Sequence, residues 1–164
     1  METTTVRKTQ RSFISAVIIT ALIAGALDML GAIISYTAAG GKKPTVIFQY
    51  IASAAFGKSA FDGSVAMIIA GLLFHYLIAF IFTVFFFLIF PKIKFLSGNT
   101  ILVAILYGIF VWAIMNRIVI PFFTKLNPVI FDLKKATIAA LILIVCIGLP
   151  VVIGARRYYR KLAL

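Results

Sequence analysis

Four long runs of apolar residues alternate with short polar stretches along the chain, at about residues 13–36, 64–90, 100–120 and 136–155. An α-helix rises about 1.5 Å per residue, so about 20 apolar residues cross the roughly 30 Å hydrocarbon core of a bilayer. The runs are continuously apolar, which argues against the alternating strands of a membrane β-barrel. The pattern therefore predicts an all-α integral membrane four-helix bundle that forms a single domain over residues 1–164.

A fifth, shorter segment at about residues 44–58 lies between the first two runs. Thr45, Gln49 and Ser53 recur at every fourth residue and form a polar stripe opposite apolar residues such as Ile51. This pattern predicts a short amphipathic helix that lies in the membrane interface or re-enters the membrane. Gln49 becomes a candidate ligand-binding residue, although a stripe that simply faces the interface is the simpler interpretation.

The composition excludes a water-soluble protein. Of the 164 residues, 63% are hydrophobic and 12% are charged, and the mean hydropathy is +1.16, whereas soluble domains carry roughly 25% charged residues. The net charge of +12 would suggest nucleic acid in a soluble chain. Here the cations lie between the apolar runs, so we expect no nucleic-acid binding and, instead, contact with anionic lipid headgroups.

The distribution of lysine and arginine predicts the orientation in the membrane, because these residues are enriched in cytoplasmic loops. With four spans, the side that holds both termini carries nine of them: Arg7, Lys8, Arg11, Lys92, Lys94, Arg156, Arg157, Arg160 and Lys161. The opposite side carries six: Lys42, Lys43, Lys58, Lys125, Lys134 and Lys135. Both termini are therefore predicted to be cytoplasmic. A fifth span at residues 44–61 would remove this bias.

The sequence offers few residues for metal or cofactor chemistry. Cys146 is the only cysteine and His75 the only histidine, so we expect no intrachain disulfide, no metal site and no cofactor. Motifs of a phosphate-binding loop or a nucleophile elbow are also missing from the sequence. No catalytic residue is predicted.

Four polar residues inside the runs are the main candidates for a functional site, because such groups are costly in hydrocarbon unless they are satisfied. Asp28, His75 and Arg117 are expected about 12, 16 and 5 Å from the outer ends of their helices. Asn116 precedes Arg117, so the four side chains could form one ligand-binding or proton-binding cluster in the outer half. The alternatives are structural: an Asp28–Arg117 ion pair, a neutral His75 bonded to the backbone, an Asn116 that joins helices, and an Arg117 that reaches the interface.

Rows of small residues at every fourth position indicate which helix faces meet other helices. One such row contains Gly71, His75 and Ala79, so His75 is expected to point into the bundle. The phenylalanines at positions 82 and 85–87 are expected to face lipid instead.

Several segments resemble the YagU-like group of small four-span bacterial inner-membrane proteins. They are Leu27-Asp28, QYIASAAFG at Gln49–Gly57, HYLIAF from His75, PKIK from Pro91, LYGIFVWAIMNRIVIP at Leu106–Pro121 and GLP at Gly148–Pro150. The resemblance implies a four-helix fold in the bacterial cytoplasmic membrane and supplies no reaction. It also implies that the segments around Asp28, Gln49 and His75 are the distinctive ones. Some members are expected to have a second histidine in the last span, which reads ALILIVCIGLP here.

Three functions fit this sequence. The first is a transport or channel-like protein with a protonatable site at Asp28 and His75, which would act as a homodimer because four helices are expected to enclose little room. The second is a non-catalytic membrane scaffold or accessory subunit. The third is a lipid-modifying enzyme that uses His75 as a base.

Overall fold

The computed structural model describes residues 2–120 and 132–162, of which 2–12 are described by their backbone only. Every element in these ranges is helical, which confirms the predicted all-α fold. The elements are α1 (Glu2–Ala38), α2 (Thr45–Phe56), η1 (Gly57–Phe61), α3 (Val65–Ile89), η2 (Phe90–Lys92), η3 (Lys94–Ser97), α4 (Thr100–Ile114), η4 (Met115–Val119), α6 (Leu133–Leu143), η5 (Ile144–Gly148) and α7 (Leu149–Leu162). Most of the predicted loop after the third run, residues 121–131, lies outside the described residues.

Four helices are long and apolar enough to cross a membrane, and the protein is a multi-pass membrane protein. They are Phe13–Ala38, Val65–Lys92, Thr100–Val119 and Leu133–Leu162. The first three match the predicted runs closely. The fourth is longer than the predicted 136–155 at both ends, because its lysines and arginines extend the helix beyond the apolar run.

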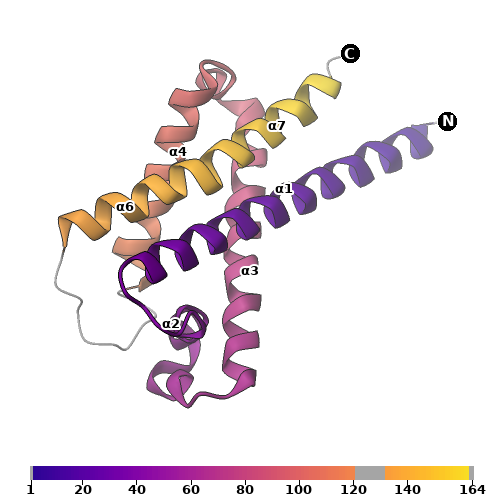
Figure 1. Ribbon diagram of the computed structural model, residues 1–164. Coiled ribbons are helices and arrows are strands. Elements are labelled where there is room, and N and C mark those ends of the chain that lie inside the picture. The colour runs from indigo at the N-terminus through magenta and orange to yellow at the C-terminus, as the bar shows by residue number, and fades with distance from the viewer. Residues whose placement is uncertain (1, 121–131, 163–164) are drawn as a thin grey trace.

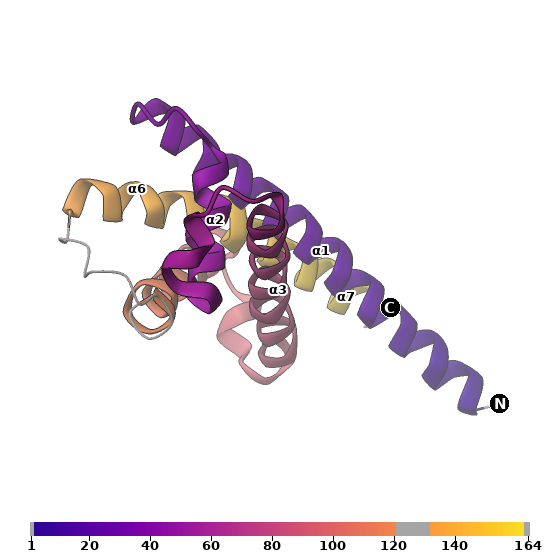
Figure 2. The same cartoon turned by 90° about the horizontal axis from the view of Figure 1, so that it is seen from below.

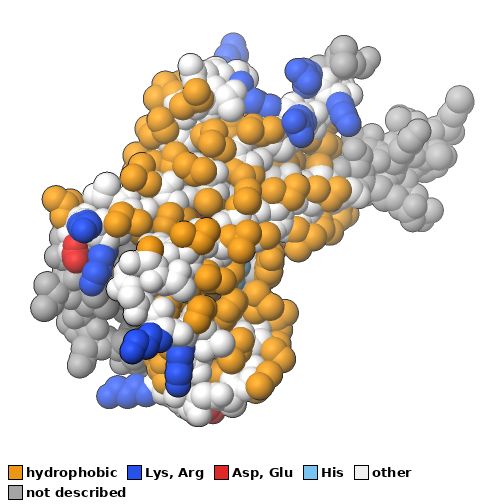
Figure 3. All heavy atoms as spheres, viewed as in Figure 1, with side chains coloured by type: hydrophobic (Ala, Val, Ile, Leu, Met, Phe, Trp, Pro, Cys, Tyr) orange, Lys and Arg blue, Asp and Glu red, His pale blue; other side chains and the backbone are white. Residues whose placement is uncertain are grey.

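The helices cross obliquely and leave the bundle with two distinct ends. In Figure 1, α1 and the continuous α6–η5–α7 helix run diagonally across α3 and α4, and Figure 2 shows the same crossing from below. Both chain termini and the α3–α4 turn lie at one end, here called the terminal end. The α2 helix, the end of α1 and the start of α6 lie at the other, the α2 end. Figure 3 shows a broad hydrophobic band between groups of lysine and arginine at these two ends.

The packed core of the bundle lies towards the terminal end. Phe86 and Phe87 are both fully buried there, and the ring of Phe86 lies 4.5 Å from that of Tyr107. The prediction that these two phenylalanines face lipid is therefore wrong, whereas Phe85 is 41% exposed. The stretch after Thr83 is continuously apolar, so polarity alone does not show which way its rings point, although the inward row of Gly71, His75 and Ala79 reaches Phe87 when it is continued at every fourth residue.

Two tyrosines join helices in this core by hydrogen bonds to backbone carbonyls. Tyr107 of α4 donates to the carbonyl of Phe82 at 2.6 Å, and Tyr159 of α7 donates to that of Phe87 at 2.7 Å. A buried hydroxyl needs such a partner in an apolar environment. Both bonds hold α3 against the neighbouring spans.

Two five-residue π-helical turns, η4 and η5, widen the third and fourth spans. Each ends two residues before a proline in the sequence, Pro121 and Pro150 respectively. The ring of Pro150 provides no N–H and displaces the carbonyl four residues earlier, that of Cys146, which lies within η5. The kink predicted at Pro150 is thus accompanied by a wide turn immediately before it.

Glycines allow the wide turn η5 to pack directly on α4. A Cβ atom on Gly108 would collide with the backbone of Ile144, and one on Gly148 would collide with the carbonyl of Ala104. Small residues permit this kind of backbone approach between membrane helices. The α4–η5 crossing therefore fixes the deep part of the bundle.

The α2 helix is present as predicted, but Gln49 and Ser53 of its polar stripe point inward, whereas Thr45 is exposed. Gln49 is 7% exposed and Ser53 is fully buried, and Ser53 donates to the carbonyl of Tyr50 at 2.6 Å. Phe56, from the apolar face, is 45% exposed. This orientation is the reverse of an interfacial helix, whose polar face meets water, and it fits a helix that re-enters the membrane.

Three of the helices begin with a side-chain cap. Asn99 accepts from the backbone N–H groups of Ile101 and Leu102, and Ser64 caps α3 in the same way. Asp132 accepts from the N–H of Lys135 at 3.1 Å and caps α6. Such caps satisfy amide groups that have no partner inside the helix.

Candidate functional site

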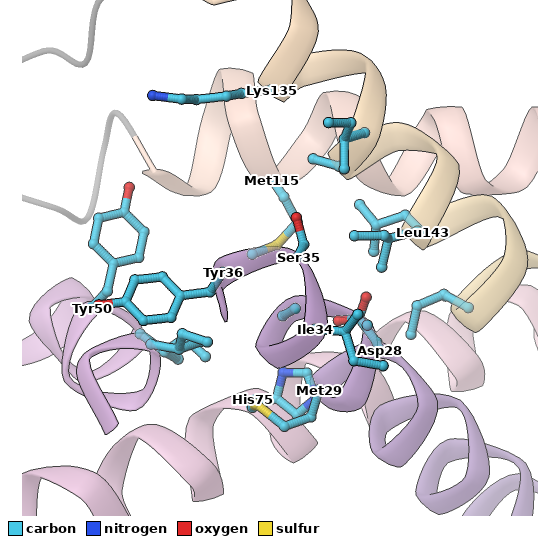
Figure 4. A pocket seen from close by; sticks show the side chains of 18 of the residues that line it. Asp28, Met29, Ile34, Ser35, Tyr36, Tyr50, His75, Met115, Lys135 and Leu143 are labelled. Carbon is cyan, nitrogen blue, oxygen red and sulfur yellow. The ribbon is translucent and has the colours of Figure 1, made fainter. Parts of the chain in front are cut away.

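A cavity of about 1120 Å³ lies between α1, α2, α3, α4 and α6, in the half of the bundle near the α2 end. Its wall is mostly apolar and includes Ile34, Ile138 and Ile142. The polar and charged side chains that line it are Asp28, Ser35, Tyr36, Tyr50, His75, Lys134 and Lys135. They occupy two levels, one deep in the bundle and one at the α2 end (Figure 4).

Asp28 and His75 form the deep level, as their positions in the sequence predict. Each lies ten residues from the end of its helix, Ala38 or Val65, which corresponds to about 15 Å along the axis. The Asp28 side chain is half-buried and lies close enough to interact electrostatically with His75. Figure 4 shows both side chains at the same part of the cavity.

A hydrogen bond between two spans fixes His75. Its Nε2 lies 2.8 Å from the carbonyl oxygen of Gly25 on α1, and a carbonyl only accepts, so Nε2 carries a proton and donates. The two helices approach closely there, and the absence of a side chain on Gly25 allows it: a Cβ atom at this position would lie only 2.9 Å from the Tyr76 ring. The Nδ1 atom of His75 is left to accept or bind a further proton.

Both side chains of the pair line the cavity and therefore face its contents. A carboxylate and an imidazole at membrane depth are groups that commonly form proton relays in membrane proteins. Because the rest of the wall is mostly apolar, the pair is the main polar feature at this depth of the cavity.

Asn116 and Arg117 do not join this pair, so the predicted four-residue cluster does not form. Both side chains are exposed and neither lines the cavity, and Asn116 donates to the carbonyl of Trp112 at 2.9 Å in its own helix. Residues four positions apart point about 40° away from each other around a helix, so a row with this spacing does not stay on one face. Asn116 and Arg117 also lie in the wide turn η4, where the regular α-helical spacing does not hold. Met115 faces the cavity in their place.

Gln49 also lies outside the cavity. Its side chain is buried, while its neighbours Tyr50 and Ile51 line the cavity. The polar stripe of α2 is thus part of the packing within the bundle rather than part of the site.

The level at the α2 end was not foreseen as part of a site. Lys134 and Lys135 begin α6, and Tyr36 and Tyr50 come from α1 and α2. The sequence presents the lysines only as loop charges that report orientation. The signal that could have found them is their position within one helical turn of a predicted span.

Trp112 is a further polar group beside the cavity. Its indole Nε1 is buried and has no hydrogen-bond acceptor among the described residues. The neighbouring residue Val111 and Met115, one turn later, both line the cavity. Trp112 is the only tryptophan of the chain.

No set of three or more metal-ligating side chains gathers within residues 13–120 and 132–162, whose side chains are described. Asp28 and His75 alone supply too few ligands for a structural or catalytic metal ion.

Comparisons with known proteins add nothing to this geometry: no family model, no curated protein and no solved structure matches the chain.

Proposed function

We propose that the protein is a small transport protein that moves protons through the Asp28–His75 pair. The observation that carries this proposal is the cavity of about 1120 Å³ that reaches from the α2 end to this pair. A cavity that leads to two protonatable groups at membrane depth is the arrangement that proton transport requires.

The packing of the other half favours a carrier over an open channel. Between the cavity and the terminal end lies the core of fully or almost fully buried residues, including Phe86, Phe87, Val151 and Val152. A channel needs a continuous path, whereas a carrier opens to one side at a time. We therefore infer a carrier, with the cavity as its opening at the α2 end.

The two other functions are less well supported. A scaffold or accessory subunit needs no cavity that leads to protonatable groups. A lipid-modifying enzyme with His75 as base needs a nucleophile or metal beside it, and no metal-ligating set gathers among the described residues.

The location and assembly follow from the sequence. We propose a YagU-like protein of the bacterial inner membrane with both termini cytoplasmic and anionic headgroups around its cations. Both termini and the α3–α4 turn lie at one end, as four spans require, and the larger number of lysines and arginines on that side supports a cytoplasmic position for it. A single chain supplies the residues that line the cavity, so the proposed site does not depend on the homodimer expected from the sequence.

Proton flux into liposomes tests the proposed function. With an imposed pH gradient and a clamped membrane potential, the wild type is expected to equilibrate internal pH faster than protein-free liposomes. Asp28→Asn and His75→Gln should each reduce the rate to that of protein-free liposomes. Asn116→Ala and Arg117→Ala are matched controls from outside the cavity and should retain the wild-type rate. Wild-type rates in both cavity variants would refute the mechanism.

A further inference from the structure

We propose that the cavity binds an anionic amphiphile, whose carboxylate or phosphate head lies at Lys134 and Lys135 and whose apolar tail fills the space between α1 and α6. The inference rests on the proposed function to the extent that this cavity is its substrate site. It names the chemical class of the molecule that binds there.

The size and the wall of the cavity favour a lipid-like tail. Sites for drug-sized ligands measure about 300–1,000 Å³, and this cavity is larger, at about 1120 Å³. A sugar, an amino acid or a hydrated ion would need many polar contacts, since buried polar groups are costly without partners. The wall between the two polar levels consists instead of side chains such as Ile34, Ile138 and Ile142.

The depth of the cavity corresponds to one leaflet of a bilayer. Gly31 of α1 meets Ile142 of α6 near the deep level, and Lys134 precedes Ile142 by eight residues, or about 12 Å along the helix. The apolar floor continues to Ile147, about 20 Å from Lys134. An acyl chain spans roughly half of the 30 Å hydrocarbon core, so a tail of this length fits.

The charge at the α2 end selects an anionic head. Among the described residues, the lysines that line the cavity are Lys134 and Lys135, and both lie at the start of α6. Asp132 faces Lys135 at 3.7 Å, but the two side chains are 42% and 81% exposed, and such exposed pairs are weak. The ammonium groups of Lys134 and Lys135 can therefore both turn towards a bound ligand. Tyr36 and Tyr50 also line the cavity at the α2 end.

Photo-crosslinking with palmitate that carries a diazirine at the end of its chain tests the inference. In nanodiscs of phosphatidylcholine, the probe is expected to label cavity residues of α1 and α3. Unlabelled palmitate should compete, whereas hexadecyltrimethylammonium and hexadecanol should not. Lys134→Ala together with Lys135→Ala should weaken binding at least about fivefold, since each lysine near a membrane surface contributes measurably to anion binding.

Matched variants separate the cavity from the lipid-facing surface. Ala139 lines the cavity, and Leu141 on the same helix is 55% exposed. Ala139→Trp should fill the cavity and abolish labelling there, and Leu141→Trp should leave it unchanged. Lys92→Ala with Lys94→Ala removes two exposed cations at the terminal end and should have no effect. Equal competition by the cationic amphiphile, or labelling that survives Ala139→Trp, would overturn the inference.

The lipid composition identifies the source of the amphiphile. If a bilayer phospholipid is the occupant, phosphatidylglycerol in the nanodiscs should displace the palmitate probe. If a free fatty acid is the occupant, phosphatidylglycerol should leave the labelling unchanged.

The crosslinking experiment and the proton-flux experiment can give negative results independently of each other. Cavity labelling without proton flux would refute the proposed transport and leave the ligand class intact. Proton flux that depends on Asp28 and His75, without cavity labelling by the anionic probe, would refute the ligand class alone.

Discussion

Single positions along α3 decide whether a phenylalanine meets lipid or protein. Phe85 is 41% exposed, whereas the next two residues, Phe86 and Phe87, are fully buried. The buried rings pack against aromatic residues of α1, α4 and α7, such as Phe13, Tyr107 and Tyr158. This aromatic cluster closes the bundle towards the terminal end.

Removal of a buried ring from this cluster should destabilise the protein strongly. Phe86→Ala leaves a cavity in the core and is expected to lower the free energy of unfolding by about 3 kcal/mol or more. Titration with a denaturing detergent measures the change. Phe80→Ala on the same helix, where the ring is 38% exposed, is the control and should cost clearly less. Equal losses in both variants would mean that Phe86 is not packed as described.

The sequence predicted the deep pair but not the rest of the site. Asp28 and His75 were found because helix rise alone sets their depth, and two ionisable groups at one depth of a small bundle meet readily. Asn116 and Arg117 were misplaced because their direction depends on the rotation of α4 and on the wide turn η4. Lys134 and Lys135 were missed because a lysine near the end of a span looks the same whether or not it lines a cavity.

Among the elements, α6 is the wall of the cavity that is held least firmly. None of its residues is buried, whereas α7 in the same span buries Val151, Val152, Ala155 and Tyr158. The two parts are joined by the wide turn η5. Elements with few buried contacts open at lower free-energy cost than the core does, so α6 is the part of the cavity wall that moves most readily.

The start of α6 should loosen in acid. The backbone N–H of Lys135 hydrogen-bonds Asp132 and lowers the pKa of its carboxyl below the ordinary value of 3.8. The cap is therefore fully present above pH 3.8 and is lost as the pH falls through the lower pKa of the folded state. Hydrogen-exchange protection of the first turn of α6, corrected for intrinsic rates, should drop between neutral pH and about pH 2.

Asp132→Asn is the matched control for this cap. The amide oxygen still accepts a hydrogen bond but does not titrate in this range. Protection in this variant should therefore not change with pH in the same way. A similar loss in both proteins would assign the acid effect to another group.

Helix lengths were predictable from the sequence, and the orientation of faces was not. Bilayer thickness and helix rise fix the number of apolar residues in a span, so the four runs located the four spans. The polar stripe of α2 was recognised, but the sequence left open whether the helix lies in the interface or re-enters the membrane, and the burial of Gln49 and Ser53 fits the second. A stripe that contains Gln49 and Ser53 can face water or satisfy its groups inside a bundle, and only the neighbouring helix α3 decides between the two.

At the scale of the whole molecule, one half is hollow and the other is packed. The cavity occupies the half near the α2 end, and the aromatic core occupies the half near the termini. The cations lie at the two ends of the bundle, as a bilayer-spanning arrangement requires, and their unequal numbers are the basis of the proposal that the termini are cytoplasmic.

Labelling of single cysteines tests this orientation. In a Cys146→Ser background, Lys134→Cys at the α2 end should react with a membrane-impermeant maleimide in intact cells. Lys94→Cys, exposed in the α3–α4 turn, should react only after the membrane is permeabilised. The reverse result would place the termini outside.

Trp112 has a practical consequence, because the fluorescence of this single indole can be used to follow changes near the cavity. Its N–H is buried without an acceptor among the described residues, a setting in which indole emission lies at short wavelength. Since the chain contains no other tryptophan, emission excited selectively from tryptophan, apart from that of the six tyrosines, comes from a single place on α4. A change that brings water to this indole would shift the emission to the red without any attached dye.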